Sequence, residues 1–192
     1  MRRLAIWSAL LATLFLIAVP SLPAPATSSS QSQKTEEKYP SALSREIHHQ
    51  ILMLPFYSVF DFVTFTLQSN KVTLSGQVLR HNLKDQAEAA VKSLEGVDSV
   101  VNNIVVLPVF PPDDDFRRAI YRAVYEDPTL ARYGIPAIPG IHIIVKNGNV
   151  TLEGSVDSLS DKNLAALRAG TVANVLGVKN NLVVLPKGIA AE

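Results

Sequence analysis

The chain has 192 residues, with 18 basic and 17 acidic side chains and no cysteine. The lack of cysteine excludes disulfides, thiolate metal sites and thiol nucleophiles. The near balance of charge gives no general attraction to nucleic acid. At this length the chain could form one domain or two small ones.

The first 26 residues are predicted to be a secretory signal peptide. Two arginines precede an apolar run of sixteen residues, Leu4 to Val19, and Ala24-Pro25-Ala26 matches an A-x-A cleavage site. The alternative is an uncleaved membrane anchor, but the run falls short of the ~20 residues that span a bilayer. We expect export with cleavage after Ala26. Two of the 18 basic residues are then lost, which leaves 16 against 17 and a formal charge of −1.

Two motifs recur at an offset of 78 residues. VTLSGQV (72–78) returns as VTLEGSV (150–156), and NNIVVLP (102–108) returns as NNLVVLP (180–186). Two matched pairs at one offset indicate a duplicated unit. The predicted divisions of the mature chain are a flexible tether (27–40), a first repeat (41–108), a linker (109–114) and a second repeat (115–187).

The segments outside the repeats have a different composition. Residues 27–39 hold no aliphatic side chain, so they cannot bury enough surface to offset the entropy of ordering. In the linker, Pro111-Pro112 is expected to block regular structure, and the run Asp113–Asp115 is expected to favour the start of the next helix. This run does not have the ligand spacing of a calcium loop, so we expect a solvated helix start.

Each repeat has the same order of predicted elements: a helix, a two-stranded hairpin, a second helix and a last strand. Helical and alternating apolar periods support this order, and Asn147-Gly148 is a strong hairpin signal. Asn82 or Ser160 is the expected N-cap of the second helix. The apolar positions of the first helices are Leu43, Ile47, Ile51, Leu54, Phe116, Ile120 and Val124. The strands are expected around 63–67, 72–78, 100–106, 141–145, 150–156 and 178–184.

The recurring motif holds one glycine in each repeat, Gly76 and Gly154. Both are expected on the inward face of the second strand, where a glycine permits close approach of the backbone to a helix. We interpret the motif as a packing solution that each repeat needs once. No chemistry follows from it.

This pattern resembles the BON domain of bacterial envelope proteins. The resemblance rests on V-x-L-x-G-x-V, then Lys84, Gly96-Val97, Val100 and an N-x-x-V-V strand, and it covers 44–108 and 115–186. It implies an αββαβ fold, often paired behind a signal peptide, and an association with the periplasm, phospholipid binding, envelope maintenance and stress response. The second repeat departs from the pattern at Asn174, in place of a glycine, and by an insertion before its first strand.

The chain shows no motif for catalysis or for a cofactor. No G-x-S-x-G elbow, P-loop or H-E-x-x-H sequence is present. His48-His49 could suggest a metal site, but adjacent helical residues point about 100 degrees apart. We therefore expect solvent-facing histidines and a protein without catalytic residues, metal or cofactor.

Two segments are not explained by simple packing. The stretch LMLPFYSVFDFVTF (52–65) gathers aromatic residues after the first helix, and some of them must be core. The stretch RYGIPAIPGI (132–141) is a loop with apolar side chains, which suits contact with a membrane or partner, although capping of the small sheet is an equal alternative. The first helix of the second repeat adds arginines that could make the same contact. The alternative interpretation is that they lie on a solvated helix face. The candidate contact residues are Tyr133, Ile135, Ile138, Arg117, Arg118 and Arg122.

Together these features predict an α+β protein of two tandem αββαβ sandwiches in a bacterial periplasm. Each sandwich is expected to pack two helices on a three-stranded sheet. The predicted function is non-catalytic binding at the cell envelope, with phospholipid surfaces as the first candidate partner. The alternative is a protein-interaction module that pairs with an envelope complex or with itself. We expect no nucleic-acid partner and identify no small-molecule substrate.

Overall fold

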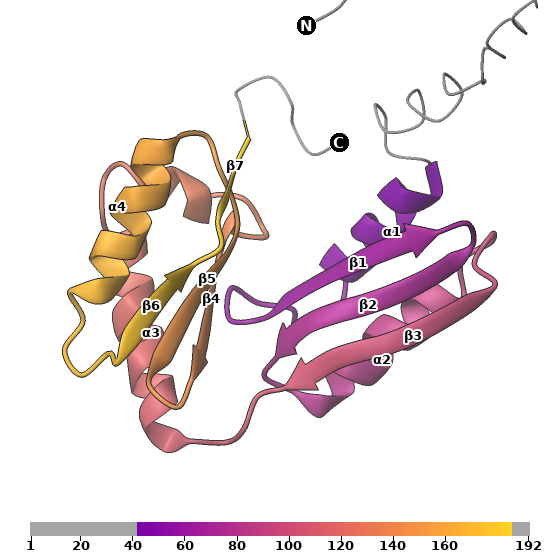
Figure 1. The fold of residues 1–192 in the computed structure, drawn as a ribbon, viewed down its shortest axis with the longest axis horizontal. Coiled ribbons are helices and arrows are strands. Elements are labelled where there is room, and N and C mark those ends of the chain that lie inside the picture. Colours follow the sequence, from indigo (N-terminus) through magenta and orange to yellow (C-terminus); the bar gives the residue numbers. More distant parts are fainter. Residues whose placement is uncertain (1–41, 186–192) are drawn as a thin grey trace, which may run out of the picture. The chain divides into compact units, whose positions relative to one another are not determined.

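The computed structural model describes residues 42–185 (Figure 1). The predicted signal peptide (1–26) and tether (27–40) lie outside the described residues. Both repeats fall within one compact unit. No helix between residues 42 and 185 is long and apolar enough to cross a membrane.

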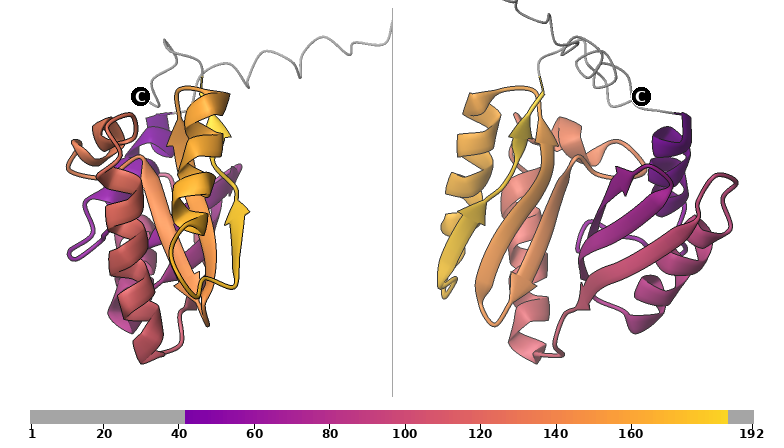
Figure 2. Two further views of the ribbon diagram at one scale, coloured as in Figure 1. Left: turned by 90° about the vertical axis from the view of Figure 1, so that its left-hand side faces the viewer. Right: turned by 45° about the vertical axis from the view of Figure 1, so that its right-hand side comes forward.

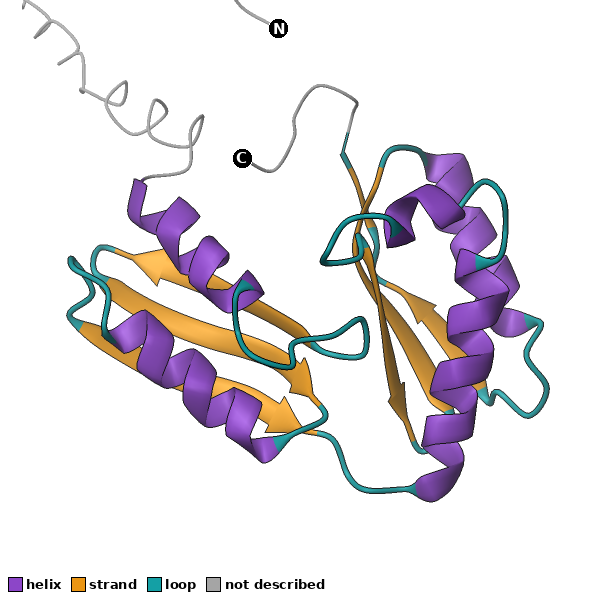
Figure 3. Cartoon of the chain, turned by 180° about the vertical axis from the view of Figure 1, so that it is seen from behind, coloured by secondary structure: helices purple, strands orange, loops and turns teal. Residues whose placement is uncertain are grey.

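The first repeat has the predicted order of elements. These are α1 (Ala42–Leu52), β1 (Phe62–Gln68), β2 (Lys71–Val78), α2 (His81–Lys92) and β3 (Ser99–Val106). The central strand β2 pairs antiparallel with β1 and parallel with β3. Both helices lie on one face of this sheet (Figure 3). The core between helices and sheet includes Ile47, Ile51, Val72, Leu74, Leu83, Ala87, Val91 and Ile104.

The second repeat has the same architecture with two additions. Its elements are α3 (Pro111–Tyr125), the 3₁₀ turn η1 (Ala131–Gly134), β4 (Ile141–Lys146), β5 (Asn149–Val156), α4 (Leu159–Gly170), β6 (Gly177–Asn180) and β7 (Val183–Val184). The last strand is split, and both of its parts pair parallel with β5, while β4 pairs antiparallel. Figure 2 shows α3 and α4 on one face of the sheet. The predicted α+β class is confirmed.

Several helix starts differ from the prediction. α3 begins at Pro111, inside the predicted linker, because proline is tolerated in the first turn, where its missing N–H needs no partner. The expected N-caps, Asn82 and Ser160, lie inside α2 and α4. The N-cap of α4 is Ser158, whose hydroxyl accepts a hydrogen bond from the N–H of Asp161. In both repeats the chain enters the second helix almost directly from the preceding strand, so the helix begins earlier than expected.

Asp113 is buried, so the expectation that the whole aspartate run is solvated is wrong. Its carboxylate accepts the N–H groups of Asn147 at 2.7 Å and Gly148 at 2.8 Å. Both of these residues have positive φ in the β4–β5 turn. Successive N–H groups in such a turn form an anion-binding concavity, and here the anion is a side chain of α3.

The repeated asparagine pair joins the last strand to the second helix. Asn102 donates from its side-chain amide to the carbonyl of Lys84 at 2.9 Å, and its oxygen accepts the N–H of Ile104. Asn180 does the same with Lys162, at 2.7 Å, and with Leu182. A short amide that donates and accepts satisfies two partly buried backbone groups at once. This role explains why the first asparagine of each NN pair recurs at the 78-residue offset.

The two motif glycines approach a neighbouring strand and not a helix, which corrects the prediction. Gly76 has φ +129, and a Cβ atom there would lie 2.0 Å from the carbonyl oxygen of Phe62. Gly154 has φ +107, and its Cβ would lie 2.3 Å from the carbonyl oxygen of Gly140. Only glycine fits, because both the backbone conformation and the adjacent strand exclude a side chain.

Changing Gly76 to Ala should therefore cost about 3 kcal/mol or more, since strain at positive φ adds to displacement of a strand. The matched control is Gly96→Ala. Gly96 also has positive φ, +88, but a Cβ there would meet only a side-chain methyl of Leu43 at 3.5 Å. The control should cost about 1 kcal/mol. Urea unfolding measures both, and equal losses would assign the glycine requirement to φ alone.

Candidate functional site

The loop between α1 and β1, residues 55–61, is held rigidly to the first repeat. Asp61 is buried, and its carboxylate accepts hydrogen bonds from the N–H and hydroxyl of Ser58 and from the N–H of Leu79. The hydroxyl of Tyr57 accepts the N–H of Val63 at 3.1 Å. Burial raises the pKa of Tyr57 to about 12, so the phenol stays protonated at neutral pH. The loop is a preformed element.

The tip of loop 55–61 packs against the second repeat. Val59 belongs to the core cluster of that repeat, and its carbonyl accepts the N–H of Ile143 on β4 at 2.8 Å. Every residue of β4 except Lys146 is buried. The loop thus covers part of an edge strand whose backbone groups would otherwise be open to pairing.

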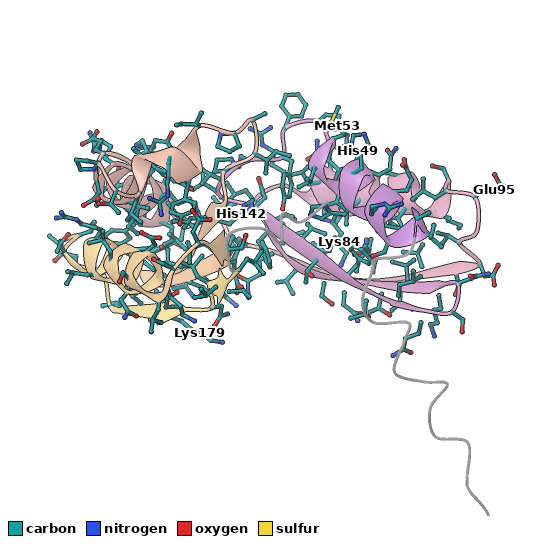
Figure 4. All side chains as sticks on the ribbon, turned by 90° about the horizontal axis from the view of Figure 1, so that it is seen from above. His49, Met53, Lys84, Glu95, His142 and Lys179 are labelled. Atoms are coloured by element: carbon teal, nitrogen blue, oxygen red, sulfur yellow. The ribbon has the colours of Figure 1, made fainter. Side chains whose placement is uncertain are left out.

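His142, on β4 and labelled in Figure 4, lies in the same contact. Its ring centroid is 5.7 Å from that of Tyr57 and 5.4 Å from that of Phe62. Burial lowers the pKa of His142, although hydrogen bonding to the backbone of Asp61 and Ser58 acts in the opposite direction. The neutral imidazole is therefore the form that this contact favours. The expectation of solvent-facing histidines is wrong for His142, because a loop from the other repeat covers it.

Next to Val59, the ring of Phe60 completes a pocket on the outer side of α3. The pocket has a volume of about 380 Å³ and is lined by Phe60, Arg118, Tyr121 and Arg122. The last three fall on one helix face because they stand at i, i+3 and i+4. The rings of Phe60 and Tyr121 meet edge to face, with centroids 6.2 Å apart. We call this the arginine–aromatic pocket.

The pocket combines positive charge with aromatic surface. Arg118 is exposed and pairs with Asp115, one turn earlier on α3. Arg122 is also exposed and makes no ion pair with any residue in the described part of the chain. A guanidinium without an internal partner can bind an external anion, and the rings can cover an apolar group beside it. Within residues 42–185, no cluster of three metal-ligating side chains is found.

Arg117 is not available for surface contact, so its predicted contact role is wrong. It is 5% exposed and points toward β4. Its guanidinium donates to the carboxylate of Asp114 at 2.6 Å and to the carbonyl of Val145 at 2.8 Å. The side chain binds the start of α3 to the end of β4, which is a structural role.

Tyr133 is also buried, which corrects its predicted exposure. Its hydroxyl accepts the N–H of Asp157 at 2.8 Å and lies 2.9 Å from the carboxylate of Asp161, to which it donates. Arg132 lies over the ring and donates to the same hydroxyl. For Tyr133 the alternative of a side chain that caps the sheet is correct. Ile135 is 81% exposed.

The structure therefore separates the six candidate contact residues. Arg118 and Arg122 come together in one pocket, Ile135 lies exposed on the loop before β4, and Ile138 there is partly buried. Sequence reasoning missed Phe60 and Tyr121 as pocket residues. Tyr121 carried a usable signal, since it stands one turn after Arg118, whereas the position of Phe60 required the fold.

The family model of the BON domain matches residues 62–108 and 113–186. The chain belongs to the BON domain family. Two solved structures are similar to this BON protein: CdsD, a structural protein of the Type III secretion system of Chlamydia trachomatis, and the C-terminal domain of CdsD. Each is 16% identical with a TM-score of 0.27, and the matches cover 75% and 76% of this chain and 92% and 98% of those chains. The comparison with curated proteins gives no match.

Replacing Tyr133 by Phe should lower the free energy of unfolding by about 1 to 3 kcal/mol, because the partly buried N–H of Asp157 loses its acceptor and the buried carboxylate of Asp161 loses a donor. Tyr121→Phe is the control. Tyr121 is 40% exposed, so its change should stay within about 0.5 kcal/mol. Urea unfolding of both variants tests this. A Tyr133 variant as stable as the parent would mean that its hydroxyl is not structural.

Stability should fall as the medium is acidified from neutral pH. The pKa of His142 is lowered in the folded state, so the unfolded chain binds more protons around and below pH ~6.5, and acid favours unfolding. Urea midpoints of the parent should decrease across this range, and His142→Asn should flatten the decrease. His49→Asn, at an exposed position, should behave like the parent. A His142 variant with the parent's slope would contradict the assignment.

Proposed function

We propose that this protein is a non-catalytic binding protein of the bacterial envelope that contacts anionic phospholipid surfaces through the arginine–aromatic pocket. The observation that carries the proposal is the joining of Arg118 and Arg122 with two aromatic rings on one exposed face of α3. Membership of the BON family, which is associated with phospholipid and the envelope, supports it. The predicted signal peptide supports a periplasmic location.

Attraction to an anionic surface must come from a local group of charges, because the whole protein has little net charge. The mature chain carries 16 basic and 17 acidic residues, so its net charge gives no attraction to an anionic membrane. Each arginine near such a surface contributes about 1 kcal/mol, so two contribute about a 30-fold increase in affinity. Tyr121 and Phe60 suit the interfacial region, where aromatic side chains place an apolar body beside polar groups. Ile135 and Ile138 stay predicted contact residues.

The test is sedimentation of the purified protein with vesicles. Binding to phosphatidylglycerol vesicles at low salt should exceed binding to phosphatidylcholine vesicles and should weaken as salt screens the charges. The double variant Arg118→Gln/Arg122→Gln should bind phosphatidylglycerol about 30-fold more weakly.

The control for this variant is Arg45→Gln/Lys92→Gln, which removes the same charge from exposed positions of the first repeat. It should bind almost as well as the parent. If both double variants lose binding equally, attraction is nonspecific. If the parent binds no anionic vesicle at low salt, the protein-interaction alternative replaces the phospholipid proposal.

A further inference from the structure

The turn after α1 presents an aromatic side chain that the fold leaves exposed. This turn spans 54–57, and the N–H of Tyr57 closes it by donating to the carbonyl of Leu54 at 3.1 Å. Pro55 occupies the second position, and Phe56, with φ +67, occupies the third. A proline followed by a residue of positive φ is typical of a type II turn, whose third position usually holds glycine. Here a bulky residue stands in the place of glycine.

Phe56 makes this turn less favourable than glycine would. A bulky side chain at positive φ is strained, and such strain is found mainly at sites with a function. The ring is 68% exposed, so burial offsets little of the strain. The hydrogen bonds of Tyr57 and Asp61 that hold the loop do not involve the ring of Phe56. The fold gains little from this ring, which points to a role at the surface.

Arg80 gives the surface around this ring a positive charge. Its guanidinium carbon lies 5.1 Å from the centroid of the Phe56 ring. Arg80 is exposed and makes no ion pair with any residue between 42 and 185. Met53, which directly follows α1 and is labelled in Figure 4, is 65% exposed. We call Met53, Phe56 and Arg80 the Phe56 patch.

The sequence around the Phe56 patch has no exposed negative charge. From Ile47 to Lys84 the only acidic residue is Asp61, which is buried. The same span holds three basic residues, Lys71, Arg80 and Lys84, so its formal charge is +2, whereas the mature chain carries −1. Exposed apolar side chains beside a guanidinium, with no carboxylate near them in the sequence, suit a surface that is anionic at its boundary and apolar beneath.

The Phe56 patch and the arginine–aromatic pocket share one loop. Phe56 and Phe60 are four residues apart in loop 55–61, and Phe60 lines the pocket. Asp61 ties this loop to the first repeat, and the carbonyl of Val59 ties it to β4. Both rings are therefore held on one unit. Two contacts on one unit bind a common surface more strongly than either does alone.

We propose that the Phe56 patch is a second point of contact with anionic phospholipid, where Phe56 and Met53 enter the interface and Arg80 binds a head-group phosphate. A guanidinium carries five N–H donors, so contact with one ring leaves donors for a phosphate oxygen. This inference rests on the proposed contact with phospholipid, and it extends that contact to the first repeat.

Phe56→Gly is the sharpest variant, because a binding role and a structural role predict different stabilities. Glycine suits the positive φ, so the variant should unfold at a urea concentration no lower than the parent's. Its affinity for phosphatidylglycerol vesicles should fall about 10-fold, since an apolar side chain no longer enters the interface. A variant that unfolds at a clearly lower urea concentration, or that binds like the parent, overturns the proposal.

The control for this variant is Leu167→Ala, which shortens an apolar side chain on α4 that is 64% exposed. It should bind like the parent. Arg80→Gln should weaken binding about 5-fold, whereas Lys92→Gln, at an exposed position of α2, should change it little. Equal losses in Arg80→Gln and Lys92→Gln would mean nonspecific attraction and would also overturn the proposal.

Fluorescence reports directly whether position 56 meets the lipid. The only tryptophan of the chain is Trp7, in the predicted signal peptide, so the parent serves as the blank. The emission of Phe56→Trp should shift to shorter wavelength on addition of phosphatidylglycerol vesicles and should be quenched by brominated lipid. Leu167→Trp should show neither effect. Equal effects at both positions contradict the proposal.

These measurements separate the inference from the pocket proposal. If Arg118→Gln/Arg122→Gln binds weakly while Phe56→Trp shows no shift, the pocket is the contact and the inference is overturned. If that double variant binds like the parent while Phe56→Gly and Arg80→Gln lose binding, the Phe56 patch is supported and the pocket is not. A parent that binds no phosphatidylglycerol vesicle at low salt overturns both.

Discussion

The hydrogen bond from the N–H of Ile143 to the carbonyl of Val59 marks the contact on which the rest of the structure depends. A small sheet with helices on one face has open edges, and the outer edge of β4 is partly covered by a loop from the other repeat. The same contact buries His142 and brings Phe60 against α3. Both the arginine–aromatic pocket and the burial of the imidazole therefore depend on this contact at the edge of β4.

The repeated fold could be predicted because it depends on the periodic spacing of apolar residues within short segments. The alternation of Val72, Leu74 and Val78 identifies a buried strand face without knowledge of what covers it. The site could be predicted only in part. Arg117 and Tyr133 are polar side chains whose burial depends on partners distant in the sequence. The spacing of apolar residues indicates which residues share a face, but it does not indicate which hydrogen-bond donor or acceptor lies opposite that face.

The duplicated units satisfy one backbone requirement with different chemistry. The N–H of Leu79 is bound by the carboxylate of Asp61, and the N–H of its counterpart, Asp157, is bound by the hydroxyl of Tyr133. A tyrosine reaches farther than an aspartate, so the inserted loop of the second repeat can satisfy the same group from a different position. The sheets have thus stayed alike, while the loops that precede them have become different surfaces.

Loop 55–61 also sets an order of events during synthesis. Ile143 follows Val59 by 84 positions, and the ribosome adds residues from the amino end. At about 5 to 20 residues per second, the apolar tip of this loop waits roughly 4 to 17 seconds for the strand that it covers. Throughout that interval the nascent chain carries an uncovered apolar segment, which is the kind of surface that chaperones bind.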